Sequence, residues 1–195
     1  MSITTGHNVI CCDRNRRGGL KTIWLANTDE IASFTPDTTA GTHGYTAVTM
    51  VAPGTDLFYK WEFDRGSAGF TASATRENGS TLIEVTLEFY IPKVTGVVNH
   101  DLMELVTSCG ITAVVESYAD DCGDGTASPV ALTYKFVLGW DEIFEETAYM
   151  EFATGEETSG VGLQDANGTA ITITTQQGEY PRQFDGDTAS APFPV

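Results

Sequence analysis

Two short segments of the chain combine residue types that could bind a metal ion. His7, Cys11 and Cys12 lie close together in the sequence, but they lack the paired Cys-x-x-Cys spacing of zinc sites. The acidic segment 120–127 is weakly similar to a calcium loop, yet Cys122 falls at the third ligand position and Ala131 falls where a bidentate glutamate belongs. We therefore expect a structural turn there, and we expect no metal and no cofactor.

The sequence contains no recognisable catalytic pattern. It has no Gly-x-Ser-x-Gly turn, no phosphate-binding glycine loop and no dinucleotide fingerprint. His7, His43 and His100 stand in unrelated contexts, and His100 falls in an expected surface helix. Carboxylates are numerous, but no spacing singles out the acid and the nucleophile of a glycosidase. We therefore predict that the protein is not an enzyme.

Residues 68–91 are predicted to form a long two-stranded ribbon around Asn78-Gly79. This dipeptide favours a type I′ turn, in which both central residues have positive φ. A two-residue loop fixes the register, so that small and apolar residues share one face in these pairs: Ala74 with Ile83, Ala72 with Val85, Phe70 with Leu87, and Ala68 with Phe89. The other face is hydroxylated and acidic, and it carries Thr71, Ser73 and Thr75 on one strand and Leu82, Glu84, Thr86 and Glu88 on the other.

The remaining periodicity predicts a mainly β protein, an antiparallel sandwich or barrel with one flanking α-helix. The helix is expected at about 94–109, where one stripe carries Val98, Leu102, Leu105, Val106 and Cys109, with Asn99 as its cap. Further strands are expected at 20–25, 45–51, 57–65, 111–116, 132–140 and 170–175. Alternation places Tyr59, Trp61 and Phe63 on one face of the strand at 57–65, and Leu132, Tyr134, Phe136, Leu138 and Trp140 on one face of the strand at 132–140.

We expect one domain over residues 1–195, with an N-terminal arm at 1–19 and a C-terminal arm at 182–195. The C-terminal arm is predicted to be ordered only by contact with a neighbour. Long loops are expected at 33–56 and 154–162, and segment 141–152 fits either a short helix or an irregular strand. The apolar phase shifts near Gly66-Ser67, which predicts a bulge or a turn.

The net charge of −17 is unevenly distributed along the chain. Residues 1–100 hold ten acids and eight bases, whereas residues 101–195 hold seventeen acids and two bases. Direct binding to a nucleic-acid backbone needs clustered lysines and arginines, so this balance disfavours it. The acidity either serves solubility alone or repels a negatively charged partner.

The chain carries no expected membrane or secretory segment. No stretch approaches the ~18 apolar residues of a membrane helix, and the first residues do not form a signal peptide. Free thiols in a reducing compartment are therefore the default for Cys11, Cys12, Cys109 and Cys122.

The order of several short phrases resembles the tail tube proteins of tailed bacteriophages. The phrases are Gly18-Gly19-Leu20-Lys21-Thr22-Ile23-Trp24-Leu25-Ala26-Asn27, then the ribbon with Arg76-Glu77-Asn78-Gly79-Ser80-Thr81, then Pro92-Lys93 before the helix, and Gly162-Leu163-Gln164-Asp165-Ala166-Asn167-Gly168-Thr169 before a final strand. The similarity covers about residues 18–180. Segments 33–56 and 140–158 depart from the pattern of that family.

This resemblance implies a virion structural protein, assembled in the host cytoplasm and located in the tail. Copies would close into homo-hexameric rings that stack into a tube, contact other tail proteins, and conduct genomic DNA without binding it specifically. We expect the polar ribbon face to line the lumen, with Glu62 and Asp64 as extensions of it. The expected lumen residues are Glu62, Asp64, Thr71, Ser73, Glu84, Thr86 and Glu88.

Two other functions are compatible with the sequence. The first is another virion component of similar fold, such as a tail terminator, a baseplate protein or a head-decoration protein. The second is a β-sandwich module that binds carbohydrate or a host surface, for which an exposed Trp24, Trp61 or Trp140 would be the sign.

Overall fold

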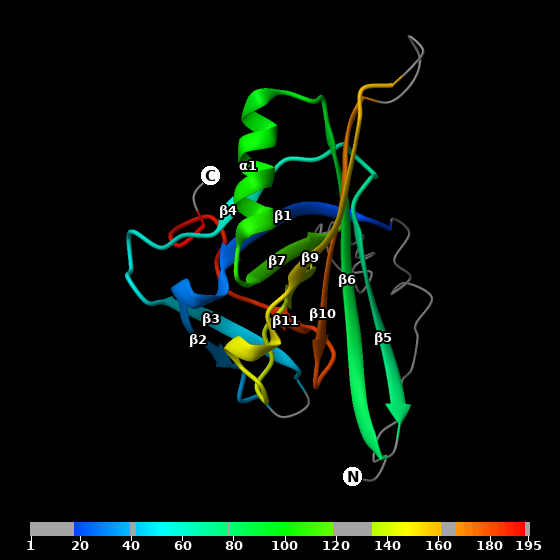
Figure 1. Ribbon diagram of the computed structural model, residues 1–195. Helices are drawn as coiled ribbons and strands as arrows, with labels where there is room; N and C mark the ends of the chain where they lie inside the picture. The colour runs from blue at the N-terminus through cyan, green and yellow to red at the C-terminus, as the bar shows by residue number, and fades with distance from the viewer. Residues whose placement is uncertain (1–17, 40–41, 78, 119–133, 161–166, 194–195) are drawn as a thin grey trace, which may run out of the picture.

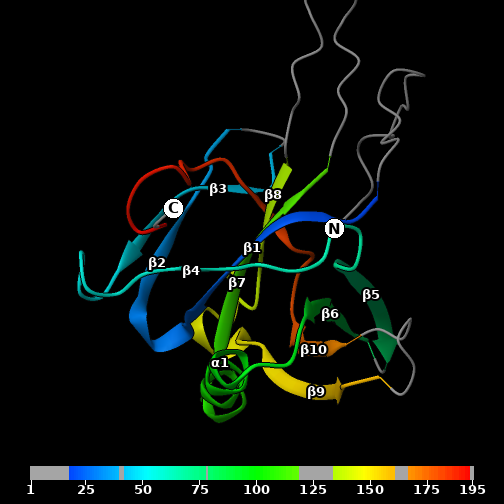
Figure 2. The same cartoon turned by 90° about the horizontal axis from the view of Figure 1, so that it is seen from above.

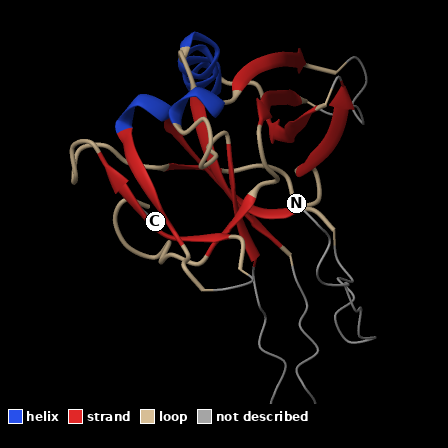
Figure 3. Ribbon diagram, turned by 90° about the horizontal axis from the view of Figure 1, so that it is seen from below, coloured by secondary structure: helices blue, strands red, loops and turns tan. Residues whose placement is uncertain are grey.

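A computed structural model describes residues 18–39, 42–77, 79–118, 134–160 and 167–193 of the 195-residue chain. The described residues form two β-sheets and one α-helix (Figure 1), and the helical turns gather along one side of the molecule (Figure 3). The mainly β fold with one helix is therefore confirmed. The elements in chain order are β1 (Leu20–Asn27), η1 (Thr28–Glu30), β2 (Ile31–Pro36), β3 (Gly44–Met50), β4 (Tyr59–Trp61), β5 (Gly69–Glu77), β6 (Ser80–Pro92), α1 (Gly96–Thr107), β7 (Ile111–Ser117), β8 (Tyr134–Leu138), η2 (Glu146–Ala148), β9 (Glu151–Thr158), β10 (Gly168–Gln177) and β11 (Arg182–Phe184).

The two sheets are open and do not close into a barrel. The seven-stranded sheet has the order β2-β3-β11-β8-β7-β1-β4, and the four-stranded sheet has the order β5-β6-β10-β9. Neighbouring strands are antiparallel, except that β11 runs parallel to β3. Seen from above, the four-stranded sheet lies across the molecule from β2, β3 and the C-terminal segment (Figure 2).

The β5–β6 hairpin has the register that Asn78-Gly79 predicts. Glu77 pairs with Ser80, so the turn has two residues, and Gly79 has a φ of 86°. Pairing between β6 and β10 stops at Ile83, so the tip of the hairpin extends beyond the rest of the sheet (Figure 1). Three of the four predicted pairs are strand partners: Phe70 with Leu87, Ala72 with Val85, and Ala74 with Ile83.

The predicted phase change before the hairpin is a turn. The Ser67 N–H donates a hydrogen bond to the Asp64 carbonyl (3.1 Å), and Gly66 has a φ of 82°. The strand predicted at 57–65 is shorter than expected, because only β4 is strand. Its alternation also fails, since Tyr59 is 55% exposed while its neighbour Phe58 is fully buried.

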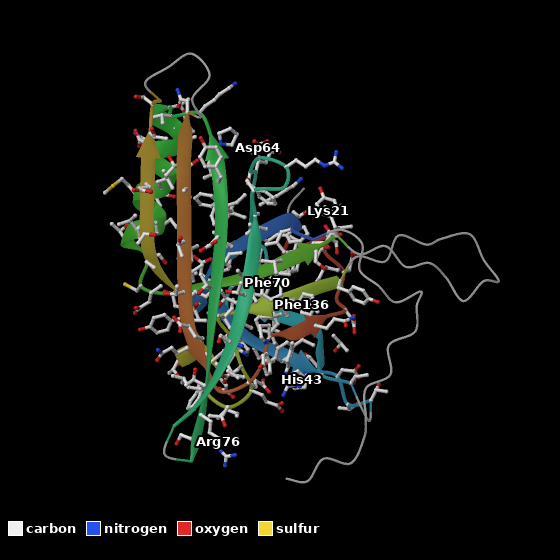
Figure 4. All side chains as sticks on the ribbon, turned by 90° about the vertical axis from the view of Figure 1, so that its right-hand side faces the viewer. Lys21, His43, Asp64, Phe70, Arg76 and Phe136 are labelled. Atoms are coloured by element: carbon white, nitrogen blue, oxygen red, sulfur yellow. The ribbon has the colours of Figure 1, made fainter. Side chains whose placement is uncertain are left out.

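The central strands of the seven-stranded sheet, β1 and β7, are buried on both faces. Ile23 and Leu25 of β1 face a core between the two sheets, whereas Trp24 faces a second core on the far side. The same holds for β7, in which every residue from Ile111 to Glu116 is buried. Across the first core, the rings of Phe70 and Phe136 approach to 5.5 Å between the sheets (Figure 4).

Two expected loops are strands instead. The region 33–56 contains part of β2 as well as β3, and only β3 matches the strand expected at 45–51. The region 154–162 belongs largely to β9, which begins inside the ambiguous segment 141–152. Strand β9 carries one large apolar residue, Phe152, so it lacks the alternation by which a strand is recognised.

Gly139 explains why Leu138 and Trp140 do not share the face predicted for the strand at 132–140. Leu138 lies in the core between the sheets, but Trp140 lies in the second core, so these two residues do not share a face. Gly139 has a φ of 78°, and this left-handed conformation changes the direction of the chain after β8. A side chain at this position would also approach the Met150 Cγ to 2.5 Å.

Helix α1 lies within the predicted range but uses another cap. The Thr95 hydroxyl, rather than the Asn99 side chain, accepts the Val98 N–H (3.3 Å). Leu102 and Leu105 are buried as expected, whereas Val106 and Cys109 of the predicted stripe are exposed. The apolar face of the helix is therefore narrower than the sequence indicates.

The prediction of a C-terminal arm at 182–195 that is ordered only by a neighbour is wrong for residues 182–193. Strand β11 inserts between β3 and β8, and Phe193 is 1% exposed in the second core, with its ring 4.7 Å from that of Phe58. The segment is thus held by its own chain. Residues 1–17 of the predicted N-terminal arm and the acidic turn at 120–127 lie outside the described residues.

Candidate functional site: the polar face of the four-stranded sheet

The outer side of the four-stranded sheet is a continuous polar surface, which we call the polar face. Alternate residues of β6 and β10 point into the core, among them Val85, Leu87, Ile171 and Ile173. Their neighbours in the sequence therefore point outward. The polar face consists of Thr71, Ser73 and Thr75 of β5, Leu82, Glu84, Thr86 and Glu88 of β6, Thr172, Thr174 and Gln176 of β10, and Glu151, Thr154 and Glu156 of β9.

Register places these side chains in rows that cross the sheet. One row joins Thr71, Thr86, Thr174 and Glu151 across all four strands. The next rows join Ser73, Glu84 and Gln176 on one side, and Glu88, Thr172 and Thr154 on the other. The surface is therefore a lattice of hydroxyls and carboxylates rather than a cleft.

The charged residues of the polar face are all acidic. It carries four carboxylates, those of Glu84, Glu88, Glu151 and Glu156, and it carries no lysine or arginine. Arg76, the single base in these four strands, pairs with Thr81 near the hairpin tip and lies on the core-side phase of β5 (Figure 4). No positive charge on the face therefore offsets its four carboxylates.

Five of the seven predicted lumen residues come together on the polar face. Thr71 pairs directly with Thr86 and Ser73 with Glu84, while Glu88 lies one row further along β6. Thr71, Ser73, Glu84 and Glu88 are exposed, and Thr86 is half-buried between its neighbours.

The two expected extensions, Glu62 and Asp64, lie outside the polar face. Glu62 follows β4 of the other sheet and lines a groove beside α1. Asp64 stands in the turn before β5, where its N–H donates to the Tyr90 carbonyl (3.0 Å). Neither residue belongs to the four strands of the polar face, because the chain leaves the seven-stranded sheet at Trp61 and turns before β5 begins.

The half of the polar face that β9 and β10 supply was not predicted from the sequence. The alternation of Ile171 and Ile173 was sufficient to assign Thr172, Thr174 and Gln176 to the outer side. No comparable signal marks β9, whose Glu151, Thr154 and Glu156 take their place only through pairing with β10. A shallow hollow of about 320 Å³ lies where Glu84, Glu151 and Gln176 meet Thr147 and Tyr149.

A compact ion-pair network lies away from the polar face. Arg182 donates from Nε to Glu179 (2.8 Å), also binds Glu142, and covers the Tyr45 ring at 5.1 Å. His43 Nε2 lies 3.7 Å from the Glu179 carboxylate. The guanidinium donates from Nε and Nη2 to both carboxylates, so this network links β3, β11 and the turn at Glu142 rather than presenting a reactive group.

Replacing Glu179 with glutamine is expected to lower stability at pH 7, and the loss should become smaller as the pH falls toward 3. Burial opposes the charge of Glu179, but the hydrogen bonds from Arg182 and the Glu142 N–H outweigh it, so the pKa of this carboxyl lies below its usual value. Because the pKa is lower in the folded state, the ionised carboxylate stabilises the fold at pH values above its unfolded-state pKa of about 4.3. This contribution disappears as the pH falls through the folded-state pKa. Urea midpoints of wild type and Glu179→Gln should converge between pH 7 and pH 3.

The exposed Glu146→Gln variant is the control for that experiment, and its midpoint should follow the wild type at every pH. A Glu179→Gln deficit that is the same at pH 3 and pH 7 would contradict a role for the ionised carboxylate.

Among the described residues, no group of three or more His, Cys, Asp or Glu is placed to hold a metal ion. Within the same part of the chain, no helix is long and apolar enough to cross a membrane. No family model matches the chain, and no curated protein or solved structure matches it.

Proposed function

We propose that the protein is a subunit of a phage tail tube, in which copies form hexameric rings and the polar face lines the lumen. The observation that carries this proposal is a sheet with one face in the core, an acidic face without bases, and two open edges. Such a sheet has the composition expected of the wall of a water-filled conduit for a polyanion.

The open edges support assembly into a ring. Strands β5 and β9 form the two ends of the sheet, and four alternating strands leave them antiparallel to each other. Strand β9 of one copy can therefore pair with β5 of the next copy, and every such pair is antiparallel. This head-to-tail contact is heterologous, and repeated by rotation it closes into a ring.

The dimensions suit a conduit for a DNA duplex. Six copies would supply about 24 strands spaced ~4.8 Å apart, which gives a circumference of about 115 Å and a backbone diameter of about 37 Å before strand tilt widens it. Because charges are screened beyond ~10 Å at moderate salt, only the carboxylates on the inner wall would act on the DNA. Glu84, Glu88, Glu151 and Glu156 would repel its phosphates.

The carbohydrate alternative has less support. Trp24 and Trp140 are 7% and 5% exposed, and the half-buried Trp61 packs edge-on against Phe89. The indoles of Trp24 and Trp140 therefore offer no open aromatic face on which a sugar ring could stack.

Electron microscopy of the purified protein, with sedimentation over a range of concentrations, tests the proposal. We expect hexameric rings and stacked tubes with a central channel. Single rings that never stack would favour a tail terminator, because such a component needs only one ring. Protein that stays monomeric at high concentration and is absent from virions would refute the proposal.

Reversing two charges on the polar face should slow genome ejection without preventing assembly. In particles built from the Glu84→Lys/Glu88→Lys variant, lysines at both positions would attract phosphates that the glutamates repel. We expect ejection to be slower by about tenfold at low salt, and the effect to shrink as salt rises. Fluorescent dye uptake by the released DNA measures this rate.

The matched control is Asp29→Lys/Glu146→Lys, which makes the same change in net charge at exposed residues outside the polar face. Ejection from the control particles should match the wild type. Equal rates for both double variants would remove Glu84 and Glu88 from the lumen.

A further inference from the structure

A groove of about 740 Å³ separates α1 from the end of the seven-stranded sheet. Its apolar lining comes from β1, β4, β6 and α1, and it includes Leu25, Trp61, Ile91, Val98 and Leu105. Three carboxylates also line it, those of Glu62, Asp101 and Glu104, against one base, Lys60. The groove therefore suits a segment that is apolar in part and basic in part.

The groove also borders an open sheet edge. Strand β4 ends the seven-stranded sheet, and its three residues pair only with Ile23–Leu25 of β1 among the described residues. The outer backbone groups of β4 remain available to a further strand. An extended segment could therefore add to this edge and insert alternate side chains into the groove.

The first seventeen residues of the chain include a segment with the matching chemistry. Val9, Ile10, Cys11 and Cys12 form an apolar run, and Arg14, Arg16 and Arg17 follow it. An apolar run of this length fits the lining of the groove, and the three arginines complement its three carboxylates. No other run of the sequence combines these two properties.

Reach decides which copy supplies the segment. The groove lies beside Leu25–Asn27, at the far end of β1 from Gly18, and β1 itself spans roughly 23 Å. Arg14 stands four residues before Gly18, so it lies at most ~14 Å from it. Arg14 can therefore approach Glu62 of its own chain, which lies beside Thr22, but it does not reach the end of its own groove beside Asn27.

We propose that residues 9–17 of one copy bind the groove between α1 and β4 of a neighbouring copy. This inference deepens the proposed function, because it assigns a contact between subunits outside the lumen. It also explains the positions of three cysteines. Cys109 is exposed in the α1–β7 connection, between groove residues Ser108 and Ile111, and docking brings Cys11 and Cys12 of the neighbour to the same place.

Oxidative cross-linking of the full-length protein tests this contact. Diamide takes two electrons and two protons from a pair of thiols as the S–S bond forms, so it traps cysteines that meet. At concentrations where copies associate, we expect a ladder of disulfide-linked species on non-reducing gels. Peptide mapping should locate the link between Cys109 and either Cys11 or Cys12.

Three variants give the expected losses. Cys109→Ser and Cys11→Ser/Cys12→Ser should each reduce the ladder at least tenfold, and Cys122→Ser should leave it unchanged. Asp101→Lys/Glu104→Lys keeps every cysteine but reverses the acidic rim, and it should reduce the ladder at least fivefold at low salt.

Other results would overturn the inference. A ladder that survives Cys109→Ser would show that the N-terminal cysteines link only to each other. A link within one chain, independent of concentration, would exclude the neighbour. Tubes that form without any Cys109 link would refute this contact while leaving the proposed function intact. Cys109 links between copies that form no rings would support this contact but refute the proposed function.

Discussion

Replacing Asp141 with alanine is expected to lower the free energy of unfolding by about 3–5 kcal/mol. Asp141 is fully buried, and its carboxylate accepts three backbone N–H groups, those of Ile143 (2.9 Å), Phe144 and Gly178 (2.7 Å). Alanine would leave these donors without their acceptor and would release the turn after β8 from the end of β10. Urea denaturation measures the loss.

The control is Glu145→Gln, an exposed change in the same turn, which should shift stability by less than about 0.5 kcal/mol. Asp141→Asn should fall between the two variants, because one amide oxygen can accept hydrogen bonds while the amide nitrogen cannot. An Asp141→Ala protein as stable as wild type would mean that water replaces the carboxylate without cost.

Proline on the outer edge of β9 is expected to abolish tube assembly while leaving the subunit folded. In an antiparallel edge strand, alternate residues direct the N–H away from the sheet, and proline removes that donor and places a ring in the path of an incoming strand. Glu156 and Glu157 are consecutive exposed residues of β9, so one of them directs its N–H outward. We expect that variant to raise the concentration needed for assembly at least tenfold.

Glu156→Pro and Glu157→Pro are made as separate variants, and each is the control for the other, because only one of them removes a hydrogen bond to β10. The variant that loses a hydrogen bond to β10 should unfold at lower urea, whereas the other should unfold like the wild type but fail to assemble. Sedimentation and circular dichroism separate these outcomes. Normal tubes from both variants would show that β9 is not the strand that pairs with a neighbour.

Local chemistry explains which parts of the fold could be predicted. The register of β5 and β6 follows from Asn78-Gly79 alone, because a two-residue turn leaves no freedom in the pairing. Alternating apolar residues likewise identify β10, and continuous apolar runs identify β1 and β7. The five central residues of the polar face were predictable for the same reason.

The missed elements depend on partners far away in the chain. Strand β9 has little apolar character and is a strand because it pairs with β10 at the edge of the sheet. The C-terminal segment is rich in glycine, aspartate and proline, yet Phe184 and Phe193 fill the second core. Gly139 reverses the expected direction of Trp140 through a backbone angle, which no pattern of side chains reveals.

The position of β11 has a consequence for the order in which the chain folds. Among the described residues, β11 is the only strand that joins β2–β3 to β8, β7, β1 and β4. The parallel pair with β3 brings together Phe184 and Tyr45, and the antiparallel pair with β8 joins residues much nearer in the chain. Contacts of such long range close late and slowly. We therefore expect the seven-stranded sheet to be completed only when β11 is inserted, and we expect this insertion to be the step that limits the rate of folding.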